Sequence, residues 1–235
     1  MSETETESQP EPPAAPTGAK GSTEVVELSS LQQSTARALA ESKAIAPHAY
    51  FSKEVDMRAA VGLLTEPVAL VDLVVRAAPL ELGAAERINA AYRDARFEIY
   101  SRINVAFSVA ARDSLVLPVI HDADSKSLAE IAAESRGLEE RARDGSITRP
   151  ELAGSTFTVT AAQGVDRFTP VITRGQAATL GVGSVFEGVT ASGGEVFVGP
   201  RLTLTLACDA RIVASAAAAD FLSSVAIRIQ EPDGL

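Results

Sequence analysis

The chain has 235 residues, of which 46% are hydrophobic, and a formal net charge of −10 at pH 7. Nucleic acids and anionic membranes are bound through clustered Lys and Arg, so this acidic balance argues against both as partners. The single cysteine, Cys208, cannot form an internal disulfide, and with only two histidines the chain offers too few soft ligands for a structural metal. No apolar run approaches the ~20 residues of a membrane helix, so we expect a soluble, cytoplasmic protein without a metal.

Residues 1–24 consist mainly of Glu, Thr, Ser, Pro, Ala and Gly and show no apolar periodicity, which predicts a disordered tail. Their acidic, polar character also differs from that of a signal peptide. Residues 25–235 are enough to bury one sizeable core, so we predict a single domain behind this tail.

Capping and periodicity predict the elements in the first half of the domain. Residues 25–28 favour a short strand. Ser29, with Gln32 three positions later, forms a capping box that predicts a helix to about Ala44. Further predicted elements are a strand over residues 50–57, a buried helix over 68–82 and a hairpin from the β-branched runs 103–109 and 115–120.

The second half of the domain is also predicted to contain both helices and strands. A capping box of Ser127 and Glu130 opens a helix that Gly145 ends. Gly181-Val182-Gly183 lacks the third glycine of a dinucleotide loop and predicts a turn. The remaining predicted elements are strands over 157–160, 178–182 and 202–208, the last with strict Leu/Thr alternation, and an Ala-rich helix over 215–229. Because strands and helices do not alternate regularly, we predict an α+β sandwich with helices packed on a mixed sheet.

Several blocks of the chain occur in the order of a known family; they are residues 28–43, 46–50, 54–57, 72–78, 115–124, 126–128, 154–160, 168–172 and 176–178. In these blocks the chain resembles the catalytic domain of the dihydrolipoamide acyltransferases, the acyltransferase components of 2-oxo acid dehydrogenase complexes. The resemblance implies the chloramphenicol-acetyltransferase-like fold, a two-layer sandwich. It also implies a homotrimer whose active sites lie in channels between neighbouring subunits.

The catalytic motif of this family is altered in the chain. Acyl transfer needs a base, because a thiol of pKa about 8.5 is only a few per cent thiolate at pH 7. The family supplies a histidine base in a motif Asp-His-Arg-x-x-Asp-Gly, whose second aspartate holds the surrounding network. The matching run is Asp209-Ala210-Arg211-Ile212-Val213-Ala214-Ser215. The resemblance therefore places Ala210 at the histidine position and Ala214 at the aspartate position, and predicts an inactive or crippled enzyme.

Other candidate residues are few. Thr160 matches the family's serine that donates a hydrogen bond to the tetrahedral oxyanion, and a threonine hydroxyl can still donate. His48 and His121 are the only imidazoles; we interpret His48 as structural and His121 as a surface residue of a turn. Cys208 has no adjacent histidine, which favours a small buried residue over a nucleophile. No residue is assigned to cofactor binding.

The resemblance also implies substrates. We expect a coenzyme A thioester, such as acetyl-CoA, as the acyl donor and a thiol or hydroxyl on a small molecule or carrier as the acceptor. We expect no covalent lipoyl group, because the chain begins almost at the catalytic domain and has no lipoyl domain. Such stand-alone relatives resemble acetyltransferases of natural-product (tetronate) biosynthesis.

Two interpretations of the alanines stay open. In the first, the natural chain is an acyltransferase with His and Asp at positions 210 and 214, and the alanines were introduced to trap a complex with substrate. In the second, the alanines are native, and the chain is a trimeric scaffold or a pseudo-enzyme that binds acyl-CoA or an acyl carrier. Ser215, where the family has glycine, favours the second interpretation.

Overall fold

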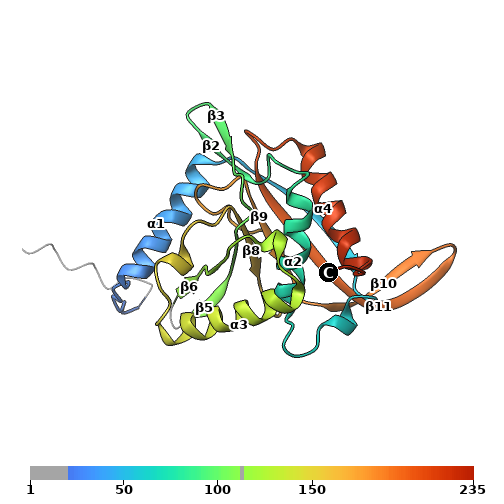
Figure 1. The fold of residues 1–235 in the computed structure, drawn as a ribbon. Helices are drawn as coiled ribbons and strands as arrows, with labels where there is room; N and C mark the ends of the chain where they lie inside the picture. The colour runs from blue at the N-terminus through green and yellow to red at the C-terminus, as the bar shows by residue number, and fades with distance from the viewer. Residues whose placement is uncertain (1–20, 112–113) are drawn as a thin grey trace, which may run out of the picture.

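A computed structural model describes residues 21–111 and 114–235. Within these residues no helix is both long enough and apolar enough to cross a membrane. The regular elements, in chain order, are α1 (Ser30–Ile45), β1 (His48–Asp56), η1 (Val61–Leu63), α2 (Leu70–Leu82), β2 (Ala90–Arg93), β3 (Arg96–Ile99), β4 (Val105–Phe107), β5 (Val109–Ala111), β6 (Ser114–Val116), β7 (Val119–Ile120), η2 (Ala123–Ser125), α3 (Leu128–Asp144), η3 (Pro150–Leu152), β8 (Phe157–Ala161), β9 (Ala178–Val182), β10 (Phe186–Ser192), β11 (Glu195–Asp209) and α4 (Ser215–Gln230) (Figure 1).

A seven-stranded mixed sheet forms one layer, in the order β1-β11-β9-β8-β4-β7, and β10 pairs with the N-terminal half of β11. Strand β8 runs parallel to β4 and β9, and the other pairs of this sheet are antiparallel. Helices α2, α3 and α4 form the second layer, with α2 in contact with both of the others (Figure 1). The predicted α+β two-layer sandwich is confirmed.

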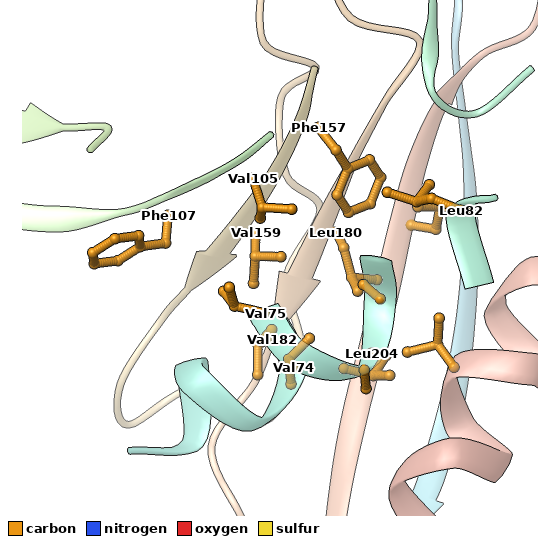
Figure 2. Packing of buried hydrophobic residues seen from close by; sticks show 14 of the residues in the cluster. Val74, Val75, Leu82, Val105, Phe107, Phe157, Val159, Leu180, Val182 and Leu204 are labelled. Carbon is orange, nitrogen blue, oxygen red and sulfur yellow. The ribbon is translucent and has the colours of Figure 1, made fainter. Parts of the chain in front are cut away.

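The hydrophobic core lies between the sheet and these helices (Figure 2). Leu202, Leu204 and Leu206 of β11 point towards the helices and are fully buried. Burying each such side chain stabilises the fold by about 1.5–3 kcal/mol, so the alternation in β11 decides which face of the sheet the helices cover. Figure 2 labels Leu204 together with Val74, Val75, Leu82, Val105, Phe107, Phe157, Val159, Leu180 and Val182.

The opposite face of the sheet is polar and carries residues 162–177, the connection between β8 and β9. The Thr158 hydroxyl donates to the Gln176 side chain at 2.8 Å. The Thr179 hydroxyl accepts the backbone N–H of Thr173 at 3.1 Å. Side-chain hydrogen bonds thus hold this connection on the sheet, where it forms one wall of the candidate site.

Helices begin where the sequence predicts caps. The Ser29 hydroxyl accepts the N–H of Gln32, and the Ser127 hydroxyl accepts the N–H of Glu130. Helix α3 ends at Gly145, whose φ of 84° is readily adopted only by glycine. Helix α4 differs, because its N-cap residue is Ala214 and no side chain in the described part of the chain caps it.

Some predictions fail or lie outside the described residues. Residues 25–28 form no strand, because no strand of the described residues lies beside this exposed segment to form hydrogen bonds with it. Gly181 is part of β9 and not of a turn. The predicted hairpin is present as the pairs β4–β7 and β5–β6, but its turn at 112–113 lies outside the described residues, as do residues 1–20 of the predicted tail.

Two hairpins were not predicted, namely β2–β3 and β10–β11. The second projects from the body of the molecule, on the side away from α1 (Figure 1). Val189, Val196 and Val198 lie on one face of this hairpin and are 71%, 69% and 67% exposed.

Candidate active site

Strand β11 ends in a turn that presents Ala210 to solvent. Asp209 is 2% exposed, and its carboxylate accepts hydrogen bonds from the backbone N–H of Arg211 (3.0 Å) and from Arg211 Nε (2.9 Å). The Asp209 carbonyl accepts the N–H of Ile212, and the N–H of Ala210 donates to the Pro47 carbonyl. The backbone of this turn is therefore held by groups other than the side chain at position 210.

Arg211 connects the turn to the β2–β3 hairpin. Its guanidinium carbon lies 3.9 Å from the centre of the Tyr92 ring. The hydrogen bond to Asp209 raises the pKa of Arg211, so the guanidinium stays charged. A cavity of about 450 Å³ opens beside Arg211. Its lining includes Asp209, Arg211, Tyr92, the end of α1 and residues 172–176. Sequence reasoning missed Tyr92, whose only signal was an aromatic residue in an arginine-rich segment.

Ala210 and Ala214 lie at the same turn, and both are exposed. Ala214 is the N-cap of α4, with φ −71° and ψ 149°, a conformation in which an Asp side chain accepts an N–H of the first helical turn. A methyl group can neither accept nor donate a proton. The structure thus brings the two predicted positions together and leaves them without a base or a cap.

His48 is held in place through both ring nitrogens. Its Nδ1 lies 2.7 Å from the carbonyl oxygen of Ala46, and its Nε2 accepts the N–H of Ile172 at 3.1 Å. Since a carbonyl can only accept and an N–H can only donate, the ring is the neutral tautomer with its proton on Nδ1. Neither nitrogen is available to take a proton from a substrate, in keeping with the structural role predicted for His48.

His121 lies at the far edge of the sheet. It follows β7, which is four strand spacings from β11, a distance of roughly 19 Å at about 4.8 Å per strand. Its neighbour Asp122 pairs with Arg102, and that hydrogen bond lowers the pKa of the Asp122 carboxyl. Both histidines of the chain are thus accounted for, and neither can serve as a base at Ala210 of the same chain.

Thr160 lies on the polar face, where β8 places it opposite Gly181 of β9. It is half-buried and makes no side-chain hydrogen bond to any described residue. From Thr160 to Asp209 is two strands across, about 10 Å, and four residues along, about 13 Å, hence roughly 16 Å in all. Thr160 and Ala210 of one chain are therefore too far apart to act on one carbonyl group.

Cys208 is fully buried on the core side of β11. Burial raises the pKa of its thiol to about 12, with a smaller contribution from the charge of Asp209. The thiol is protonated at neutral pH, in keeping with the predicted small buried residue. Among the described residues, no three His, Cys, Asp or Glu side chains lie close enough together to hold a metal ion.

The family described as 2-oxoacid dehydrogenases acyltransferase (catalytic domain) matches residues 20–235. The chain belongs to this family. The dihydrolipoyllysine-residue acetyltransferase component of the mitochondrial pyruvate dehydrogenase complex of Schizosaccharomyces pombe is 31% identical over 233 residues, which cover 93% of this chain and 48% of that protein. The chain spans about half the length of the curated acyltransferases that it matches.

Solved structures of the acyltransferase family agree with this assignment. A probable dihydrolipoamide acetyltransferase from Listeria monocytogenes superposes with a TM-score of 0.86 at 26% identity, over 91% of this chain and 96% of that one. A chloramphenicol acetyltransferase superposes with a TM-score of 0.50 at 10% identity, over 82% and 94% of the two chains, and so shows the shared fold alone. The predicted chloramphenicol-acetyltransferase-like fold of this acyltransferase domain is confirmed.

One prediction about the acyltransferase is wrong. We expected a coenzyme A thioester as the acyl donor and no part for a covalent lipoyl group. The relatives are named dihydrolipoyllysine-residue acetyltransferases, so in those proteins a lipoyl group attached to protein takes part in the transfer, which contradicts the expectation. The error arose because the expectation relied on where the chain begins, which says nothing about the group that meets the catalytic domain.

Proposed function

We propose that this chain is a catalytic-domain subunit of an acyltransferase that moves an acyl group from a dihydrolipoyl thioester to the thiol of coenzyme A, and that the missing base slows this reaction by orders of magnitude. The observation that carries the proposal is Ala210, an exposed methyl group on a turn held by Asp209 and Arg211. In the transfer, the acceptor sulfur attacks the carbonyl carbon and the bond from that carbon to the dihydrolipoyl sulfur breaks. The acceptor's proton ends on the departing sulfur.

The base is needed at the start of this sequence. Without an imidazole, the attack depends on the few per cent of thiolate that a free thiol provides at pH 7. Loss of the base in comparable enzymes costs roughly 10⁴-fold or more, and binding and oxyanion stabilisation supply the remaining catalysis. We therefore propose residual and not zero activity for the chain as it stands.

The separation of Thr160 from the Ala210 turn supports a homotrimer with sites between subunits. At roughly 16 Å within one chain, the oxyanion donor and the base position can meet at one carbonyl only if each comes from a different copy. The cavity beside Asp209 and Arg211 would then receive Thr160 from a neighbouring subunit.

The apolar face of the β10–β11 hairpin supports the same assembly. Val189, Val196 and Val198 are each more than 65% exposed, and a second copy of the chain is the partner proposed to cover them. Val189→Glu together with Val198→Glu is expected to convert trimers to monomers in sedimentation velocity. Leu115→Glu, which changes a 48% exposed leucine of β6 on the side of the molecule away from this hairpin (Figure 1), is the control and is expected to stay trimeric.

Restoring the motif tests the proposed activity. The Ala210→His, Ala214→Asp double variant is expected to transfer acetyl from S-acetyldihydrolipoamide to coenzyme A about 10³-fold or more faster than the parent chain. The matched control is Ala219→His with Ala216→Asp, which places the same side chains at exposed alanines of α4. Equal rates for the two variants would contradict the proposed transfer and leave the trimeric scaffold as the function.

The same assay examines the acceptor. A hydroxyl-bearing small molecule of natural-product type is the second candidate acceptor, which rests on the resemblance to tetronate acetyltransferases. Supplying hydroxyl acceptors in place of coenzyme A to the restored variant distinguishes the two, because only the true acceptor gives release of free dihydrolipoamide thiol that saturates with acceptor concentration.

A further inference from the structure

Two hydroxyl groups lie side by side at the carboxyl ends of the parallel strands β4 and β8. Phe107 of β4 is the partner of Val159 of β8, and both face the core. The N–H of Ser108 continues this ladder by donating to the carbonyl of Val159 at 3.2 Å. Since side chains alternate along a strand, Ser108 and Thr160 both face the polar side of the sheet.

Ser108 is oriented by a backbone group next to Thr160. Its Oγ accepts the N–H of Ala161, the residue after Thr160, at 3.1 Å. This bond uses a lone pair of Ser108 and leaves its O–H free to donate. The Thr160 hydroxyl is also free to donate, since no described residue bonds it. Both residues are half-buried and thus reachable by a ligand.

The spacing of neighbouring strands allows the two hydroxyls to share a single acceptor atom. Neighbouring strands are about 4.8 Å apart, so an oxygen midway between two hydroxyls at that separation can lie about 2.8 Å from each. Two donors on one oxygen are what a tetrahedral oxyanion requires.

Apolar groups border the pair on its other side. Gly181 is the β9 partner of Thr160, and a β-carbon at Gly181 would lie 3.2 Å from the Phe168 ring and from Pro170. These side chains therefore pack over the sheet directly beside Thr160. Apolar surroundings exclude water and strengthen a hydrogen bond from a hydroxyl to a negatively charged oxygen.

We infer that Ser108 and Thr160 together form a two-hydroxyl oxyanion site, in which Ser108 is a second donor to the thioester carbonyl oxygen as negative charge develops on it. This inference rests on the proposed acyl transfer. It adds a residue, Ser108, that no motif of the sequence indicated.

Kinetics in the Ala210→His, Ala214→Asp background test the inference. Ser108→Ala is expected to lower kcat about 10²-fold with little change in KM, and Thr160→Ala is expected to do the same. Ser184→Ala is the matched control, because Ser184 also accepts a backbone N–H, that of Gly164 at 2.7 Å, and is expected to leave kcat within twofold. An active restored enzyme whose kcat is unchanged by Ser108→Ala overturns the inference and leaves the proposed transfer intact.

A second measurement does not depend on turnover. The parent chain lacks the base, so a bound thioester persists, and the infrared stretch of a ¹³C-labelled thioester carbonyl reports hydrogen bonds to its oxygen. We expect this band to move to lower wavenumber in the parent, to move less in Ser108→Ala and least in the Ser108→Ala, Thr160→Ala double variant. A band at the same position in the parent and in Ser108→Ala overturns the inference even if the restored variant proves inactive, a result that would separately refute the proposed transfer.

Discussion

The two ends of the polar face of the sheet differ in the polar side chains that they present. At the turn after β11, the backbone N–H groups of residues 210–213 are bonded and Asp209, Arg211 and Tyr92 hold the turn, yet the two positions that the resemblance matches to a histidine and an aspartate are alanines. At the carboxyl end of β8, Thr160 and Ser108 still present hydroxyls. The comparison teaches that groups other than the side chains at positions 210 and 214 hold the turn, so its shape does not depend on which side chains these two positions carry.

The largest expected effect concerns the packing at the hydroxyl end. In Gly183→Ala, the new β-carbon would overlap the backbone carbonyl of Asp166, so residues 165–166 must move off the sheet. We expect the free energy of unfolding in urea to fall by about 3 kcal/mol. Gly62→Ala, where nothing lies within 4 Å of the new atom, is the control and is expected to change it by less than about 0.5 kcal/mol. Equal stability of the two variants would mean that this end is not rigid.

The corresponding test at the turn is Arg211→Ala. It leaves the Asp209 carboxylate, 2% exposed, without its charged partner, and we expect a loss of about 2 kcal/mol in the free energy of unfolding. Arg167→Ala removes an ion pair with Glu54 in which both side chains are well exposed, and we expect at most about 0.5 kcal/mol. If the free energy of unfolding falls by no more in Arg211→Ala than in Arg167→Ala, the pairing of Asp209 with Arg211 does not hold the turn.

A smaller effect sharpens the contrast between a capped and an uncapped helix. Ala214→Asp supplies α4 with a cap and a negative charge at its N-terminus, so we expect the free energy of unfolding to rise by about 1 kcal/mol. Ser127→Ala removes the cap of α3, and we expect a fall of similar size. A loss of stability in Ala214→Asp would show that the turn no longer accepts the family's side chain.

The pH dependence of stability should have opposite signs at two carboxylates away from the site. Burial raises the pKa of Asp72, against hydrogen bonds from Ser135 and Ala69, so its contribution to stability is present at low pH and lost as the pH rises through the folded-state pKa. A hydrogen bond from Arg58 lowers the pKa of Asp56, whose contribution is present above its unfolded-state pKa of about 4 and lost on acidification.

Urea unfolding of Asp72→Asn and Asp56→Asn between pH 2 and pH 7 measures both. Relative to the parent, Asp72→Asn is expected to gain stability as the pH rises, and Asp56→Asn to lose it. Parallel curves for the two variants would show that burial does not dominate at Asp72.

Local sequence patterns were sufficient to predict elements that depend on side chains and backbone groups only a few residues apart. Ser29 with Gln32 and Ser127 with Glu130 located the starts of α1 and α3, and the Leu/Thr alternation located the C-terminal half of β11. The β2–β3 hairpin was missed because its turn residues Asp94 and Ala95 adopt left-handed φ values of 46° and 63° without a glycine.

The same limit applies to the site. Motif position alone placed Ala210, Ala214 and Thr160, and the structure adds where they lie. The stacking of Arg211 on Tyr92 and the pairing of Ser108 with Thr160 depend on strand register and on contacts between distant parts of the chain. No local pattern reports such contacts, and the fixation of both nitrogens of His48 was likewise visible only in the folded chain.

The rate at which the single thiol, that of Cys208, is alkylated can report how often strand β11 opens. It is fully buried in a central strand, and its pKa of about 12 keeps it unreactive towards alkylating reagents while β11 stays paired. Alkylation therefore requires β11 to separate from the helices or from its neighbouring strands. The alkylation rate measures how often this separation occurs. The turn begins one residue after Asp209, so a side chain restored there is expected to change how often β11 opens. The alkylation rate of Cys208 measures this change without a second label on the protein.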